Sequence, residues 1–208
     1  LFVGGKLTTE VHGKKVVVSQ ETRYPWDGKV SILLETADSQ DFALRIRVPG
    51  WSDSFAFEVN GEEQRGIVRE RGFAVLRRTW KTGDRVSFEI PLPVRMVFAH
   101  PNVAADFGRA AIMRGPVVYC VESAGNATPV ERMALKQGAE LRVEHRADLL
   151  GGVSVVTGKA FELQGWTEGT PYRDRPADAA PVDFTAIPFF VNSNRESGRM
   201  QVWLPLAY

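Results

Sequence analysis

The stretch Phe-Ala-Leu-Arg-Ile-Arg-Val at residues 42–48 places an apolar side chain at every even-numbered position and puts Arg45 and Arg47 between them. Successive side chains of a β-strand point to opposite faces, so this spacing predicts a strand with one buried and one solvated face. We expect the four even-numbered residues to face a core and both arginines to face solvent.

The same alternation recurs on both sides of this stretch, at residues 55–59 and 85–90. Asn60-Gly61 follows the first of these runs, and Lys81-Thr82-Gly83-Asp84 precedes the second. Both segments are typical of tight hairpin turns, because glycine and asparagine accept positive φ. Helical periodicity is nearly absent, so helices should hold less than about a tenth of the residues. The sequence predicts an all-β protein of two tandem antiparallel β-sandwich, jelly-roll-like domains.

The ladder of hydrogen bonds must pause at Pro91 and Pro93, because neither proline can donate. The strand pattern at 94–98 follows, and the domain boundary is expected within a few residues of the polar stretch from His100 to Asp106. We assign residues 1–98 to the first domain and residues 99–208 to the C-terminal domain. In the second part, the continuous apolar runs at 110–113 and 117–121 indicate strands covered on both faces. Four prolines between residues 171 and 188 predict a long irregular loop there.

The composition excludes several classes of protein. Of 208 residues, 44% are hydrophobic and 25% charged, which is typical of a globular domain. Lys+Arg total 26 and Asp+Glu 25, a net charge of +1, with 15 basic and 13 acidic residues in the first 98. Neither half is a basic surface, so neither nucleic acid nor an anionic membrane is an expected partner. No apolar run approaches the ~20 residues of a membrane span.

Few residues are candidates for a catalytic, metal-binding or ligand-binding site. Cys120 is the sole cysteine, which excludes an intrachain disulfide and a cysteine cage, and the three histidines are too scattered to predict a metal site. Cys120 lies in an apolar strand pattern and is expected to be structural. No catalytic residue is predicted. Trp26, Trp51 and Trp166 lie in loops, where an exposed indole either binds a sugar ring or partner protein or packs over the end of its own sandwich.

Several segments together resemble the C-terminal region of glycoside hydrolase family 127, the β-L-arabinofuranosidase family. The resemblance rests on short motifs that keep their order along nearly the whole chain. They include Gln-Glu-Thr-Arg-Tyr-Pro-Trp-Asp-Gly at 20–28, Leu-Arg-Ile-Arg-Val-Pro-Gly-Trp at 44–51, Met-Arg-Gly-Pro-Val-Val-Tyr-Cys at 113–120, Asn194-Arg195, and Val-Trp-Leu-Pro at 202–205.

This resemblance implies an N-terminal (α/α) barrel that carries catalysis, followed by two β-sandwich domains. It implies a cysteine nucleophile near zinc and a glutamate acid/base on that barrel, and none of these maps onto this chain. The chain itself would then need no cofactor, and its partner would be the missing barrel. The resemblance points to a bacterial protein of carbohydrate metabolism, in the cytoplasm or periplasm, and the sequence does not fix the compartment.

Three functions remain open: a non-catalytic accessory region of a glycoside hydrolase, a carbohydrate-binding module, and an unrelated structural or adhesive sandwich. The ordered motifs favour the first over the third. Because the chain begins with Leu1 inside an apolar pattern, we expect a fragment of a longer protein. Such a fragment should expose an apolar docking face, with Tyr24, Trp26 and Trp51 as candidate residues, through which a homodimer could also form.

Overall fold

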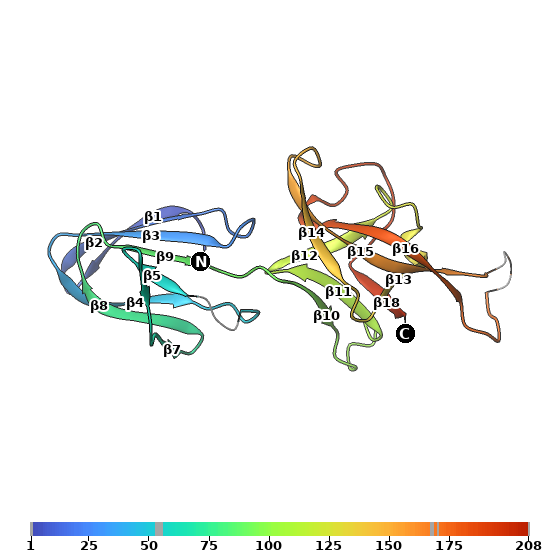
Figure 1. The fold of residues 1–208 in the computed structure, drawn as a ribbon, viewed down its shortest axis with the longest axis horizontal. Helices are drawn as coiled ribbons and strands as arrows, with labels where there is room; N and C mark the ends of the chain where they lie inside the picture. Colours follow the sequence, from blue (N-terminus) through green and yellow to red (C-terminus); the bar gives the residue numbers. More distant parts are fainter. Residues whose placement is uncertain (1, 53–55, 167–168, 170, 208) are drawn as a thin grey trace. The chain divides into compact units, whose positions relative to one another are not determined.

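A computed structural model describes residues 2–52, 56–166, 169 and 171–207. β-strands dominate these residues, and the helical segments among them are two single 3₁₀ turns, η1 (Val130–Arg132) and η2 (Phe189–Val191). The predicted all-β class is confirmed. No helix in this part of the chain is long and apolar enough to cross a membrane. The chain divides into two compact units, Leu1–Leu92 and Pro93–Tyr208, which are described separately (Figure 1).

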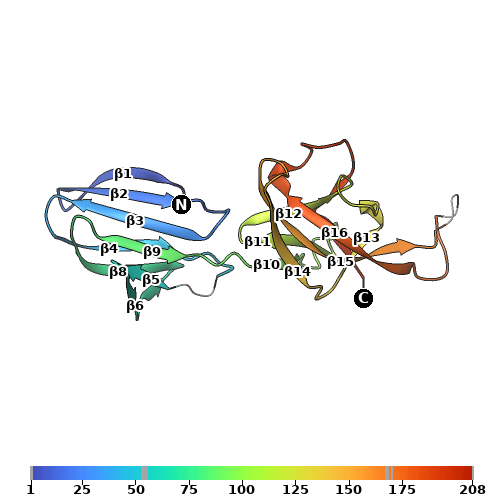
Figure 2. The same ribbon diagram turned by 45° about the horizontal axis from the view of Figure 1, so that its top comes forward.

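The first unit is a sandwich of two antiparallel sheets (Figures 1 and 2). The larger sheet has the strand order β1-β2-β3-β9-β5-β6, and the smaller has the order β4-β8-β7. The strands are β1 (Gly5–Val11), β2 (Lys14–Thr22), β3 (Lys29–Thr36), β4 (Gln40–Arg47), β5 (Phe57–Val59), β6 (Glu62–Gln64), β7 (Val68–Glu70), β8 (Phe73–Trp80) and β9 (Arg85–Glu89).

The core of this unit lies between the two sheets and has the alternation expected from the sequence. In β4, Ile46 is buried while Arg45 and Arg47 are exposed; the even-numbered Phe42 and Leu44 are half-buried and pack against the same core. Both arginines have partners on the outer face. Arg45 forms an ion pair with Glu70 on β7, and the Arg47 guanidinium lies over the ring of Phe73 on β8. The other core residues are Val30, Ile32, Leu34, Val48, Phe57, Val59, Ala74, Leu76, Trp80, Val86, Phe88 and Ile90.

Of the two predicted hairpin turns, Asn60-Gly61 joins the paired strands β5 and β6, whereas residues 81–84 form a turn from β8 to β9, which lie in different sheets and do not pair, so this second turn is not a hairpin. Side-chain hydrogen bonds link the two turns. Asn60 and Gly61 have φ values of 56° and 83°. The carboxylate of Asp84 accepts hydrogen bonds from the backbone N–H of Lys81 (2.8 Å) and from the Asn60 amide (2.9 Å). Burial acts to raise the pKa of Asp84, but these hydrogen bonds and nearby positive charges lower it below its usual value. The predicted strand over 55–59 is observed as Phe57–Val59, and Phe55 lies outside the described residues.

The second unit contains one nine-stranded sheet whose pairings close into a circuit. The strands β11, β18, β13, β15, β16 and β12 follow one another around it, and β12 pairs again with β11. One pairing departs from the antiparallel prediction, since β13 and β18 run parallel through Leu135 and Leu206. The strands are β10 (Val94–Phe98), β11 (Arg109–Arg114), β12 (Val117–Glu122), β13 (Met133–Lys136), β14 (Leu141–Arg146), β15 (Val153–Gln164), β16 (Asp178–Pro188), β17 (Met200–Gln201) and β18 (Trp203–Ala207).

Two segments differ from the sequence prediction. All five residues of β10 pair with β11, so residues 94–98 belong to the second unit, and the units divide between Leu92 and Pro93 rather than after residue 98. Much of the predicted irregular loop is the strand β16, which contains Pro181. At Pro181, β16 pairs with β15 on one side, and its pairing with β12 begins only at Ala186. A strand can hold a proline where one of its edges is free of ladder hydrogen bonds.

Substitutions in β4 test the assignment of its two faces. We expect Ile46→Ala to lower the free energy of unfolding by about 2–5 kcal/mol, because it leaves a cavity in the core. Arg45→Ala removes an exposed ion pair and should cost less than ~1 kcal/mol. Chemical denaturation of the full chain measures both values, and equal losses would contradict an outer face open to solvent.

Candidate functional site

Trp26 and Trp51 lie in two loops of the first unit that adjoin the same short segment. The backbone carbonyl of Gly28 accepts the Ile90 N–H at 2.8 Å, and the Trp51 indole donates to the carbonyl of Pro91 at 3.3 Å. A Cβ atom at Gly28 would overlap the carbonyl of Ile90, so only glycine permits this close approach. The structure therefore brings these two predicted residues to one end of the first unit.

Their exposures differ, and this changes the predicted docking face. Trp26 is 54% exposed, whereas Trp51 is half-buried. Tyr24, which precedes a cis-proline, packs against the core of its own unit and contacts the Phe2 ring edge-to-face at 5.4 Å. Burial raises the pKa of the Tyr24 hydroxyl. The expectation that Tyr24 lines an exposed docking face is corrected, because its ring completes the core instead.

Trp166 belongs to the second unit, in the connection between β15 and β16. Its ring is 51% exposed, and the Arg173 guanidinium lies 4.7 Å from the ring centroid. Two of the predicted tryptophans thus lie in one unit and the third in the other, and no single unit gathers all three.

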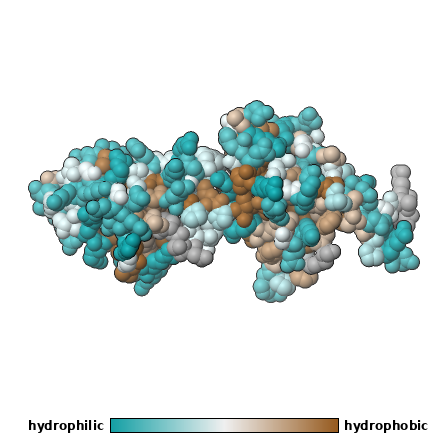
Figure 3. Space-filling model, viewed as in Figure 1, coloured by the Kyte–Doolittle hydropathy of each residue, from teal (hydrophilic) through white to brown (hydrophobic). Residues whose placement is uncertain are grey.

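Exposed apolar side chains also occur near one hairpin of the second unit. Phe98 ends β10, and Val103 and Phe107 lie in the connection to β11; all three are about half exposed or more. Figure 3 shows hydrophobic residues gathered over β10 and β11 of this unit. The sequence analysis did not select these residues, because single apolar residues in a loop carry no periodic signal.

Cys120 has the structural role expected from the sequence. It is 1% exposed in β12 and packs with Val153, Val155 and Ile187. Burial, together with the negative charge of Glu122, raises the pKa of the thiol to about 12, although Arg195 acts in the opposite direction. A thiol of this kind is not a nucleophile near neutral pH. Within the described residues, no group of three or more His, Cys, Asp or Glu side chains is placed to hold a metal ion.

A buried ion pair lies beside Cys120 and attaches the segment after η2 to β12. Arg195 donates from Nε and Nη2 to one carboxylate oxygen of Glu122, at 3.1 and 2.7 Å, and the Ser193 N–H donates to the other at 2.8 Å. The exposed side-chain fractions are 7% for Glu122 and 21% for Arg195. Residues 73 positions apart give no sequence signal of such a pair.

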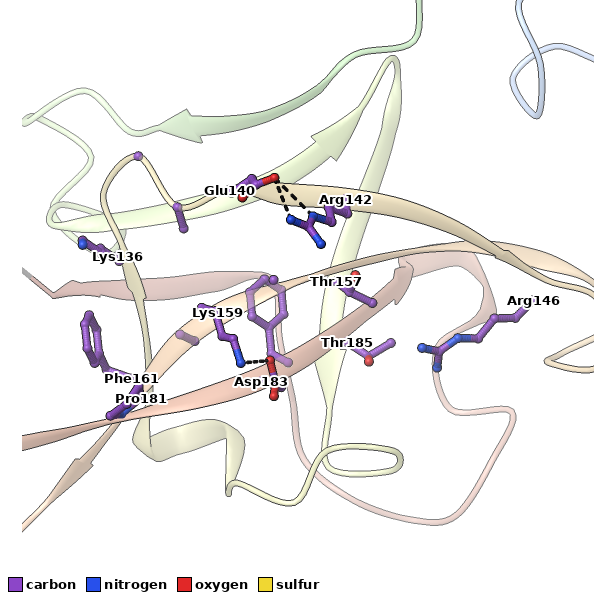
Figure 4. Close-up of a pocket in the computed structure, with 15 residues that line it drawn as sticks. Lys136, Glu140, Arg142, Arg146, Thr157, Lys159, Phe161, Pro181, Asp183 and Thr185 are labelled. Atoms are coloured by element: carbon purple, nitrogen blue, oxygen red, sulfur yellow. Dashed lines mark hydrogen bonds and ion pairs between the residues drawn. The ribbon is translucent and has the colours of Figure 1, made fainter.

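A hollow of about 740 Å³ lies on the outer face of β15 and β16 in the second unit (Figure 4). Its floor comes from these two strands, and one wall comes from the connection between β13 and β14. The sequence analysis did not find this groove, because its residues come from strands that lie apart along the chain. Its lining residues are Lys136, Gly138, Ala139, Glu140, Arg142, Arg146, Thr157, Gly158, Lys159, Ala160, Phe161, Pro181, Asp183, Phe184 and Thr185.

Comparisons with known proteins agree with this two-unit architecture. Residues 1–92 match the family description "Beta-L-arabinofuranosidase, GH127 middle domain", and residues 94–205 match "Glycoside hydrolase family 127 C-terminal domain". A curated relative, the non-reducing end β-L-arabinofuranosidase of Bifidobacterium longum subsp. longum, is 34% identical in an alignment 200 residues long that covers 90% of this chain and 30% of the relative.

Solved structures are similar over the whole chain. A GH127 β-L-arabinofuranosidase from Geobacillus stearothermophilus has a TM-score of 0.90 and 37% identity, and 33% of its length is covered. A second structure, described as a glycoside hydrolase, has a TM-score of 0.89 and 31% identity, with 35% of its length covered. All-β units of this kind are thus parts of larger glycoside hydrolases. The chain belongs to glycoside hydrolase family 127, as a portion made of its middle and C-terminal domains, and it spans about a third of the length of these relatives.

The buried thiol gives a direct chemical test. At pH 8, a pKa of about 12 leaves about one Cys120 thiol in ten thousand ionised, so we expect negligible reaction with a disulfide reagent in the folded chain and complete reaction after denaturation. Absorbance of the released thiolate measures both. Stoichiometric reaction of the folded chain within minutes would contradict a buried, protonated Cys120.

Removing one partner of the Glu122–Arg195 pair should lower the free energy of unfolding strongly. Arg195→Ala leaves a buried carboxylate without its counter-ion, and we expect a loss of about 3–5 kcal/mol in unfolding free energy. Arg142→Ala is the matched control, because its ion pair with Glu140 is exposed on both sides and should be worth less than ~1 kcal/mol. Differential scanning calorimetry of the unsubstituted chain and of the two variants measures their melting temperatures. Similar melting temperatures for the two variants would refute the structural role of Arg195.

Proposed function

We propose that the two units support a catalytic (α/α) barrel belonging to the same, longer glycoside hydrolase, and that they perform no hydrolysis themselves. The observation that carries this proposal is the extent of the family matches. The middle and C-terminal domain descriptions account for residues 1–92 and 94–205, while the relatives are about three times as long. The arabinofuranosidase activity for which these relatives are named would then reside in the part of the longer protein that lies outside these two domains.

The chemistry of this chain supports the same proposal. Glycoside hydrolysis usually requires two facing carboxyl groups or a comparable nucleophile and acid/base. The cysteine is protonated in the core, and the most buried carboxylate of the second unit, Glu122, is occupied by Arg195 and the Ser193 N–H. Neither group is available to a substrate.

Each unit by itself has exposed apolar residues that could pack against a further domain. Phe98, Val103 and Phe107 in the second unit and Trp26 in the first are each exposed by 47% or more. Large apolar side chains that gather at a surface mark interaction sites. A homodimer would use the same side chains and is the competing partner for this surface.

Activity of the purified chain tests the proposal. We expect no release of nitrophenol from an aryl β-L-arabinofuranoside, with or without added zinc, under conditions where an intact family member is active. Turnover that survives repeated purification and disappears in a point variant of this chain would overturn the non-catalytic assignment.

Glycan binding by the exposed tryptophans is a second proposal, favoured by the exposure of Trp26 and Trp166. These residues are 54% and 51% exposed, and an exposed indole face can stack on a sugar ring; in Trp166 one face already carries the Arg173 guanidinium, so a sugar would need the other face. Trp51 is a weaker candidate, because it is half-buried and its indole N–H is bonded to Pro91. Titration with arabinose-containing oligosaccharides should produce fluorescence changes that Trp26→Ala or Trp166→Ala removes; unchanged titrations in both variants would exclude this mode.

A further inference from the structure

The floor of the groove on β15 and β16 consists of three successive cross-strand pairs. Thr157 lies opposite Thr185, Lys159 opposite Asp183, and Phe161 opposite Pro181. Residues two apart share one face of a strand, so the pairs form a row with a spacing of about 6.6 Å, twice the rise per residue. Figure 4 shows these side chains along the groove.

The row changes in chemistry along its length. Phe161 and Pro181 give a flat apolar patch at one end. In the middle, the Lys159 ammonium lies 2.6 Å from the Asp183 carboxylate. Beyond it stand the two threonine hydroxyls, with Arg146 at the far end of the groove (Figure 4). Alternation of a ring-sized apolar surface with donors and acceptors is what a sugar chain presents, since each sugar has an apolar face and a rim of hydroxyl groups.

One wall of the groove depends on a glycine. A Cβ atom at Gly158 would lie 3.0 Å from the Glu140 carbonyl oxygen and 3.1 Å from the Phe184 ring, so the β13–β14 connection sits directly on β15. Glu140 in this wall accepts two hydrogen bonds from the Arg142 guanidinium at 3.2 and 3.0 Å. The β13–β14 connection, which forms this wall, therefore contacts β15 at Gly158 on its inward face, the face of Phe184, and not on the face of the floor pairs.

The lining has an excess of positive charge. It holds four basic side chains and two acidic ones, a difference of +2. Three of the cations are paired, Lys159 with Asp183, Arg142 with Glu140, and Arg146 with Glu144 outside the lining. Lys136 makes no ion pair within the described part of the chain, and Figure 4 shows it at the same end as Phe161. A ligand that carries a carboxylate complements this charge.

An acidic peptide could satisfy the charge but fits the floor less well. Peptides commonly bind to sheets by adding a strand at a free edge, where backbone groups are available. The floor itself is the face of strands paired with each other along its whole length, so it offers side chains, whereas the free edge of β16 before Ala186 lies outside the face that lines the groove. Recognition here must come from stacking and from side-chain hydrogen bonds.

We propose that this groove binds an acidic oligosaccharide. One sugar ring stacks on Phe161 and Pro181, its neighbours place hydroxyl groups against the Lys159–Asp183 pair and the threonines, and a uronate carboxylate pairs with Lys136. The site uses none of the tryptophans and is independent of the proposed support of a barrel.

A matched pair of probes tests the groove on the full chain. Isothermal titration compares a xylo-oligosaccharide that carries one glucuronic acid with the unsubstituted xylo-oligosaccharide of the same length. We expect the acidic probe to bind at least about tenfold more tightly, and we expect Lys136→Gln to remove this preference while leaving the melting temperature unchanged, because Lys136 is exposed. Phe161→Ala should weaken the binding of both probes about tenfold or more.

Control variants separate this site from the other proposals. Phe107→Ala removes an exposed ring outside the groove lining and should leave binding unchanged. No binding of either probe, equal binding of both, or binding that Lys136→Gln and Phe161→Ala leave intact would overturn the proposal. Tighter binding of a hexaglutamate peptide than of the acidic saccharide would also overturn it. Loss of binding only in Trp26→Ala or Trp166→Ala would assign the glycan to the tryptophans instead.

Discussion

The pairing of β15 with β16 is the constraint on which the second unit depends. Nine residue pairs join these strands, and this ladder satisfies the backbone groups that the two strands direct at each other. On one side β15 pairs with β13 and β14, and on the other β16 pairs with β12, so the circuit of strands closes through this hairpin. The inward residues Ala160 and Phe184 join the core and also border the groove, whose floor is formed by their outward neighbours. The pairing of β15 with β16 therefore positions both the core, on the inward face of the two strands, and the floor of the groove, on their outward face.

Much of the first unit could be predicted from the sequence because its signals are local. Alternation within β4 determines which side chains are buried, and Asn60-Gly61 specifies its turn through positive φ. The assignments that failed depend on distant partners. Residues 94–98 belong to the second unit only because β11 pairs with them, and the parallel contact of Leu135 with Leu206 joins positions that no local pattern connects.

Candidate site residues could likewise be predicted only where the signal in the sequence is local. Loop position alone selected three tryptophans, but exposure depends on tertiary contacts, and Trp51 is partly covered through its bond to Pro91. The groove arises where β15 meets β16, as in the pair Thr157 and Thr185; a strand was expected from residue 184, but the part of β16 before it falls where an irregular loop was expected. Cys120 was predicted correctly, because an apolar run on both sides of a cysteine is a local signal of burial. The motifs that indicate family 127 were sufficient for the family and did not locate the groove.

The central claim is that these two domains stabilise the catalytic part of a longer glycoside hydrolase. Thermal unfolding of the Geobacillus stearothermophilus relative tests it most directly, measured on the intact enzyme, on the enzyme without the matching third, and on a chimera in which this chain replaces that third. The account predicts that truncation lowers the melting temperature or causes aggregation and that the chimera recovers both stability and arabinofuranosidase activity. A truncated enzyme that keeps the melting temperature and activity of the intact one would contradict it.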